Sequence, residues 1–156
     1  MHDRAAALSR VVLCALLCIL GSAVRAEAGS CSVSTTPVVF GAYNVFATSP
    51  GDSTGTVVYR CTGNVDGLLI TISKGRSTTF LPRQLGKGLE RLSYNLFRDA
   101  ARTVVWGDYS AGTSAFIDLS PPNNRNETLT VYGRIPAGQD ISAGAYTDSV
   151  TLTVNY

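Results

Sequence analysis

Histidine and charge are both scarce in this chain of 156 residues. Its single histidine is His2, and Lys, Arg, Asp and Glu together make up 15% of the sequence. With one histidine the chain cannot build a Ser-His-Asp triad or a histidine-ligated metal site away from its N-terminus. The 13 Lys and Arg nearly balance the 11 Asp and Glu. We therefore expect no nucleic-acid partner, because that kind of binding needs a basic patch.

Motifs for bound cofactors are also missing. No loop of alternating acids around a glycine predicts calcium, and no glycine-rich turn between a strand and a helix predicts a phosphate site. The carboxylates are mostly isolated in expected turns. We expect neither a small-molecule cofactor nor an enzyme. A carboxylate-pair enzyme remains a minor alternative, which two acids about 5 to 10 Å apart in a cleft would support.

Only one long apolar run occurs, at residues 11–20, VVLCALLCIL, after Arg4 and Arg10. It is too short to span a bilayer as a helix and is typical of a secretory leader. We expect residues 1–26 to be a signal peptide, with cleavage after Ala26 or Ala28. Residues 27–156 then form one domain of the exported chain, with room for a single core.

Cysteines are few once the leader is set aside. Cys14 and Cys18 lie in the apolar run, which leaves Cys31 and Cys61. An even pair in an exported chain predicts one disulfide in an oxidising compartment.

No segment has a long helical period, whereas short alternating runs recur between Gly, Pro, Asn and Ser. The chain is therefore predicted to be all-β, as a two-sheet sandwich. The expected strands are 31–40, 54–61, 68–73, 92–98, 103–106, 115–119, 128–135 and 146–156. The expected core residues are Val38, Phe40, Val57, Tyr59, Leu69, Tyr94, Leu96, Leu129, Val131, Val150 and Leu152.

The middle stretch YNLFRDAARTVVWGD, residues 94–108, allows two interpretations. We favour a hairpin in which residues 94–97 pair with 103–106, and in which Arg98, Asp99 and Arg102 form a solvated turn. The alternative is that these charges form a recognition cluster. Trp106 and Tyr109 could stack on a sugar, but such aromatics more often belong to the core.

Four stretches together resemble one family. CSVSTTPVVFGAY, YRCTG, YNLFRDAARTVVWGD and VYGRIPAGQDISAGAYTDSVTLTVNY follow one another between residues 31 and 156. In order and spacing they are similar to the spore coat protein U domain family, which also supplies the subunits of archaic, Csu-type chaperone-usher pili.

The resemblance implies an immunoglobulin-like sandwich that lacks its last strand and is completed by a donated one. It implies a pilus, fimbrial or coat subunit with a role in adhesion or biofilm formation, passing through the periplasm to the cell surface. The implied partners are a periplasmic pilus chaperone, an outer-membrane usher and other pilus subunits. The expected donor-strand groove is lined by Val38, Phe40, Val150, Leu152, Val154 and Tyr156.

The chain departs from the family pattern before its first expected strand. Between the expected cleavage sites and Cys31 there are at most Glu27, Ala28, Gly29 and Ser30. Such a short polar stretch cannot complete a neighbour, so we expect a tip or terminating subunit or a non-polymerising coat protein. The alternative function is a self-sufficient secreted β-sandwich module that binds a glycan or a surface.

Overall fold

A computed structural model describes residues 28–156, so the expected signal peptide, residues 1–26, lies outside the described residues. Within the described range every regular element is a strand, and no helix is long and apolar enough to cross a membrane. The strands are β1 (Ser30–Thr36), β2 (Gly51–Thr62), β3 (Leu68–Ile72), β4 (Arg83–Lys87), β5 (Glu90–Phe97), β6 (Phe116–Asp118), β7 (Asn126–Ile135) and β8 (Leu152–Asn155).

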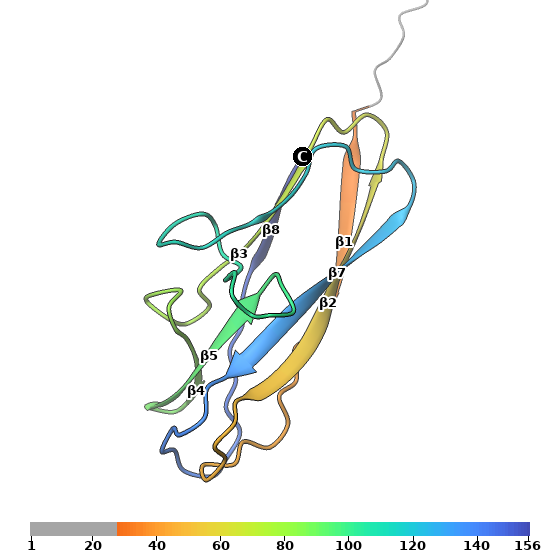
Figure 1. The fold of residues 1–156 in the computed structure, drawn as a ribbon. Helices are drawn as coiled ribbons and strands as arrows, with labels where there is room; N and C mark the ends of the chain where they lie inside the picture. The colour runs from red at the N-terminus through yellow and green to blue at the C-terminus, as the bar shows by residue number, and fades with distance from the viewer. Residues whose placement is uncertain (1–27) are drawn as a thin grey trace, which may run out of the picture.

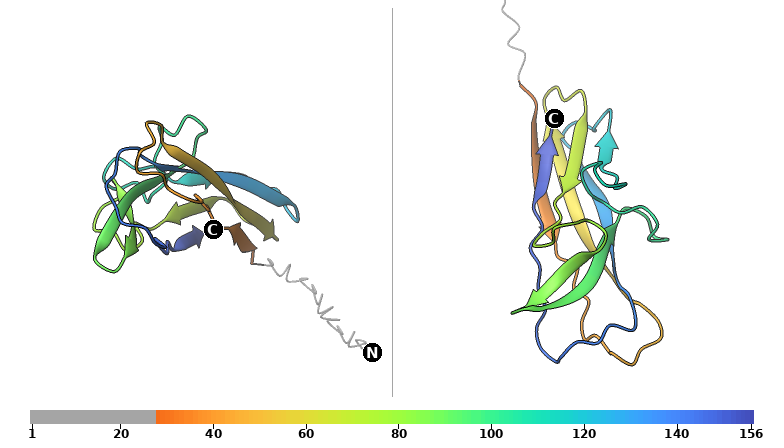
Figure 2. Two further views of the ribbon diagram at one scale, coloured as in Figure 1. Left: turned by 90° about the horizontal axis from the view of Figure 1, so that it is seen from below. Right: turned by 90° about the vertical axis from the view of Figure 1, so that its left-hand side faces the viewer.

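The strands form two sheets that face each other (Figures 1 and 2). One sheet has the order β1-β2-β7-β5-β4 and the other has the order β6-β3-β8, with antiparallel pairing throughout. This confirms the all-β, immunoglobulin-like two-sheet sandwich expected from the sequence. The order leaves β1 at the edge of the larger sheet and β8 at the edge of the smaller one.

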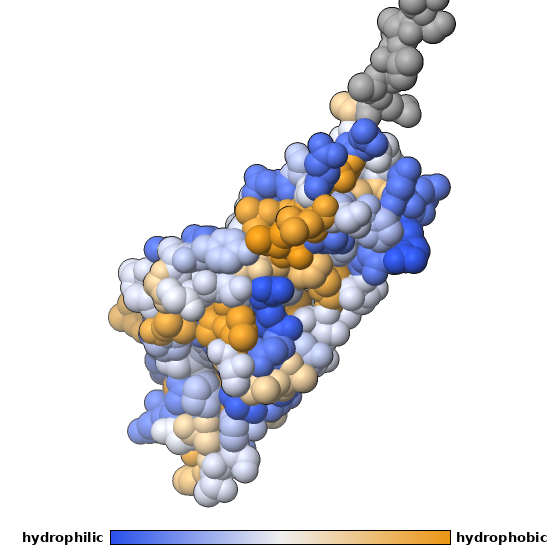
Figure 3. Space-filling model, turned by 45° about the horizontal axis from the view of Figure 1, so that its top comes forward, coloured by the Kyte–Doolittle hydropathy of each residue, from blue (hydrophilic) through white to orange (hydrophobic). Residues whose placement is uncertain are grey.

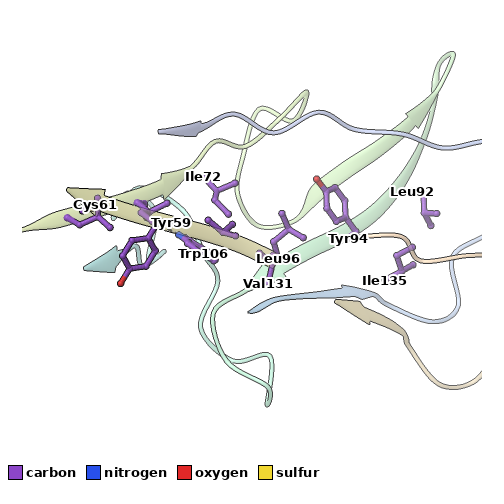
Figure 4. Close-up of a cluster of buried hydrophobic side chains, with 12 residues drawn as sticks. Tyr59, Cys61, Ile72, Leu92, Tyr94, Leu96, Trp106, Val131 and Ile135 are labelled. Carbon is purple, nitrogen blue, oxygen red and sulfur yellow. Dashed lines mark hydrogen bonds between the residues drawn. The ribbon is translucent and has the colours of Figure 1, made fainter. Parts of the chain in front are cut away.

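The core follows from alternation along the long central strands. On β2, Val57, Tyr59 and Cys61 point inward and are at most 3% exposed. On β7, Val131 shares this inward face because successive strand residues point to opposite sides. Figure 4 shows Tyr59, Cys61 and Val131 in one buried cluster with side chains of β3 and β5.

Several expected strands are wrong in extent. β1 ends at Thr36, before Pro37, which has no N–H to offer a ladder. Residues 103–106 form no strand and make only single bridges, such as Phe97 to Val105. The last strand begins at Leu152 and not at residue 146. β4, with the polar sequence RQLGK, was not expected at all.

The expected core also needs correction on β3 and near the C-terminus. Leu69 is only half-buried, whereas Leu68, Ile70 and Ile72 are at most 3% exposed. A shift of one residue along a strand exchanges its two faces, and the apolar run LLITI carries no alternation that fixes the face. Val150 is not a core residue, since 36% of its surface is exposed.

The charged turn after β5 is exposed at Ala100, Ala101 and Thr103, but its two arginines are not free in solvent as we expected. Arg98 donates to the Ser114 hydroxyl, at 2.9 Å, and lies over the ring of Phe116. Arg102 forms an ion pair with Asp52, with 3.3 Å between nitrogen and oxygen, and only 14% of its side chain is exposed. These arginines fasten the turn to the sandwich, which also argues against a free recognition cluster.

The single tryptophan belongs to the core and cannot serve as a sugar platform. Trp106 is 1% exposed, and its indole N–H donates to the Ile70 carbonyl at 3.0 Å. Tyr109 is exposed.

Candidate functional site

The first edge strand is fastened covalently to its neighbour. Cys31 and Cys61 are bonded, which confirms the expected disulfide. They are direct partners in the antiparallel register of β1 and β2. The bond therefore ties the edge strand β1 to the interior of its own sheet and does not join the two sheets.

The C-terminal segment is held on one side only. Leu152 to Asn155 pair with β3, and further down Thr147 exchanges two backbone hydrogen bonds with Gly86 of β4. On its other side lies β1, which is side by side with β8 in Figure 2. Within residues 28–156 no backbone ladder joins the two. The wall of strands thus has a gap between β1 and the C-terminal segment.

A groove runs along this gap and contains two cavities. The first, about 480 Å³, lies between residues 35–40 on one lip and residues 148–152 on the other. The second, about 620 Å³, lies between residues 38–46 and residues 141–148. Both are lined by Val38, Phe40, Leu85 and Asp148. We call the lips and both cavities together the groove.

The floor of the first cavity is the hydrophobic core. Val57, Ile72, Tyr94, Leu96 and Val131 line it, and each is at most 5% exposed. A space of this shape, apolar below and flanked by the two lips, can accept an extended polypeptide whose alternate side chains point downward.

The structure places the six residues predicted for the groove in two groups. Val38 and Phe40 line both cavities, and Val150 and Leu152 line the first. Val154 packs against the core but lines neither cavity, and Tyr156 is 59% exposed and also lines neither. Four of the six therefore lie on facing lips of the groove.

Leu85 and Asp148 line the groove but were not predicted there. Leu85 lies on β4, whose polar sequence hides it. Asp148 shares the inward parity of Tyr146, Val150 and Leu152. An acid among these inward, mainly apolar residues could have identified it as a groove residue from the sequence. Among the residues that line either cavity, Asp148 is the only charged one.

Asp148 is held in place by three hydrogen bonds. Its carboxylate accepts from the Tyr94 hydroxyl at 2.8 Å and from the backbone N–H groups of Arg76 at 2.9 Å and Ser149 at 2.8 Å. Burial of the phenol, and then its bond to this carboxylate, raise the pKa of Tyr94. The Tyr94 ring packs edge-on against Phe40, with the ring centroids 6.0 Å apart. Asp148 is thus fixed where the two cavities meet.

The lower part of the C-terminal lip is fastened to the β4–β5 hairpin by polar contacts. Glu90 accepts hydrogen bonds from the hydroxyls of Tyr146 and Ser142, and Lys87 donates to Ser142. The bonds from Tyr146 and Ser142 lower the pKa of Glu90. Across residues 28–156 no three His, Cys, Asp or Glu side chains are grouped as a metal site would require.

Apolar side chains are also exposed away from the groove. On the face drawn in Figure 3 they gather in patches separated by hydrophilic residues. The most exposed of them are Leu89 and Leu119, at 95% and 80%, whereas Phe46, at 88%, lines the second cavity of the groove. Single exposed apolar residues are ordinary on protein surfaces.

Comparisons with known proteins agree on one family. The model of the Spore Coat Protein U domain matches residues 20–153. Protein U of Myxococcus xanthus is 30% identical over 111 residues, which are 66% of this chain and 59% of that protein. The chain thus spans 59% of the length of that curated relative.

A solved structure shares the fold. It is the CsuC–CsuE chaperone–tip adhesion subunit pre-assembly complex from archaic chaperone-usher Csu pili of Acinetobacter baumannii. The TM-score is 0.58 at 19% identity, and the match covers 83% of this chain and 40% of the matched chain.

Proposed function

Because the chain belongs to the Spore Coat Protein U domain family, we propose that it is a structural surface subunit completed by a strand that another polypeptide donates. The observation that carries this proposal is the gap between β1 and the C-terminal segment, floored by the core. A donor strand in the gap would pair with one or both lips and cover the apolar floor.

The energetics of the groove support this proposal. Full burial of a Val or Leu side chain contributes on the order of 1.5–3 kcal/mol, and whole domains are stable by only about 5–15 kcal/mol. Val38, Val150 and Leu152 line the groove and are not fully buried. A chain that leaves this surface and two strand edges bare should be marginally stable and prone to associate.

The proposed partners follow from this role. A periplasmic pilus chaperone would occupy the groove first, an outer-membrane usher would assemble the subunit, and a neighbouring subunit would then replace the chaperone strand. The likeness to a solved chaperone–subunit complex supports the first step. The route requires export through the signal peptide that we expect at residues 1–26, and ends in a fimbrium or coat at the cell surface.

Within such an assembly we propose a tip or terminating position, with adhesion or biofilm formation as the outcome. Gly29 and Ser30 lie between the later expected cleavage site and Cys31, and Ser30 already belongs to β1. Cleavage there would leave a subunit that accepts a strand and has none to give.

The experiment that tests the proposal adds a strand to the chain itself. A segment of alternating Val and Thr is fused after Tyr156 through a flexible linker, and thermal unfolding and size-exclusion are compared with those of the unfused chain. We expect the unfused chain to melt low or associate and the fusion to be a more stable monomer. The control donor carries Ser in place of each Val. Equal stability of all three chains would refute the proposal.

A further inference from the structure

Asp148 places one carboxylate in the groove. It is the one charged side chain that lines the cavities, and it lies where they meet, opposite Val38 and Phe40. It faces inward with Val150 and Leu152, so a strand laid along this lip would cover it.

The carboxylate has one unfilled position. Its two oxygens can accept about four hydrogen bonds, and Tyr94, Arg76 and Ser149 supply three. Within residues 28–156 it forms no ion pair. The charge of the buried Arg83 interacts with Asp148, but its guanidinium makes no hydrogen bond to this carboxylate and donates instead to the Ser73 carbonyl at 3.0 Å and to the Trp106 carbonyl at 2.6 Å.

An open groove leaves this carboxylate hydrated, but a covering strand expels the water. A charge buried without a partner is far less stable than one that is paired and hydrogen-bonded. An apolar donor side chain at this point would therefore weaken binding of the donor strand. A cation would instead pair with the carboxylate and fill its remaining hydrogen-bonding position.

We propose that the donor strand of the neighbouring subunit carries a lysine or arginine at the inward position facing Asp148, among otherwise apolar inward residues. This rests on the proposed function. The cavities on either side, about 480 and 620 Å³, leave room for a long side chain. Asp148 then acts as a specificity residue, because donors without the cation bind but leave its charge buried and unpaired.

The test uses the full chain with the donor strand fused after Tyr156. Each inward donor position carries in turn Met or Lys, which are similar in length, and the midpoint of thermal unfolding is measured. We expect Lys to lower the midpoint at every inward position except one, where it raises it by at least about 3 °C.

Two variants identify the residue responsible. Asp148→Asn keeps acceptors for Arg76 and Ser149 but removes the charge, so Lys should lose its advantage at that position. Asp118→Asn is the matched control, because Asp118 accepts from the Tyr59 hydroxyl at 2.6 Å and lines neither cavity. In that control the advantage of Lys should persist.

The outcomes separate the two proposals. If Met is better than Lys at every position while the Met donors still stabilise the chain, the role of Asp148 is wrong and strand acceptance stands. An advantage of Lys that survives Asp148→Asn also overturns it. If no donor stabilises the chain, the proposed function itself fails.

Discussion

Replacing Val150 with aspartate should prevent a donor strand from stabilising the chain, while the unfused chain still folds. Val150 lines the first cavity, on the inward face of the lip, and is 36% exposed. A carboxylate at this position can stay hydrated in the open groove. A donor strand would bury it two residues from Asp148, on the same side of the segment, where repulsion between like charges adds to the loss of hydration.

The magnitude follows from the cost of an unpaired buried charge, which is about 3–5 kcal/mol. The entropy of unfolding is about 2.1 cal/mol/K per residue, so for a domain of about 130 residues this cost lowers the midpoint of thermal unfolding by roughly 10–18 °C. The donor strand should therefore confer most of its stabilisation on the parent chain and little on Val150→Asp.

Thr151→Asp provides the control, because Thr151 is the next residue and is exposed on the opposite face. A surface substitution of this kind usually changes stability by less than about 0.5 kcal/mol. The assay is thermal unfolding of parent and variants, each with and without the fused donor. Equal losses in the two variants, or a full gain in Val150→Asp, would refute the idea that this lip is covered by a donor.

Three further predictions concern the frame of the groove. Replacing both Cys31 and Cys61 with serine removes a bond between residues 30 apart in the sequence, so the free energy of unfolding, measured with urea, should fall by roughly 3.5 kcal/mol. No change would mean that the stability of β1 does not depend on the disulfide. Arg83→Met leaves the carbonyls of Ser73 and Trp106 without their buried donor, and the free energy of unfolding, measured with urea, should fall by about 2–5 kcal/mol. Burial lowers the pKa of Arg83 to about 10, so burying the charged guanidinium has its own cost. An unchanged free energy of unfolding would show that this cost outweighs the hydrogen bonds. Burial and the bond to Asp148 raise the pKa of Tyr94 above its ordinary 10.0. The contribution of Tyr94 to the stability of the fold is therefore fully present below about pH 10 and is lost as pH rises further. Between pH 8 and 11 the midpoint of urea unfolding should fall more steeply in the parent than in Tyr94→Phe.

Local alternation was enough to predict the inward faces of both lips, and the family resemblance implied that these faces line a groove. Val38 and Phe40 were assigned to one inward face, and Val150 and Leu152 to another, because a period of two is a property of neighbouring residues. The pairing of Cys31 with Cys61 was predicted from their number and the expected compartment. Neither inference needed contacts between distant parts of the chain.

The parts that the sequence could not predict depend on distant partners. β4 is polar in sequence, and the burial of Arg83 depends on carbonyls that β3 and the Trp106 loop bring to it. Leu69 lies in an apolar run with no alternation, so its face is set by the pairing with β6 and β8. The groove position of Asp148 depends on Tyr94, 54 residues away.

The disulfide between β1 and β2 has a mechanical consequence for a domain held in a fibre. Tension on a donor strand in the groove would pass into the two lips. On one side the load reaches a strand that is bonded covalently to its neighbour through Cys31 and Cys61. On the other side β8 is held to β3 by four residue pairs of a backbone ladder, and lower down by the bridge between Thr147 and Gly86. Under tension the domain should therefore unfold first at its C-terminal lip. The disulfide determines which side of the groove separates from its sheet.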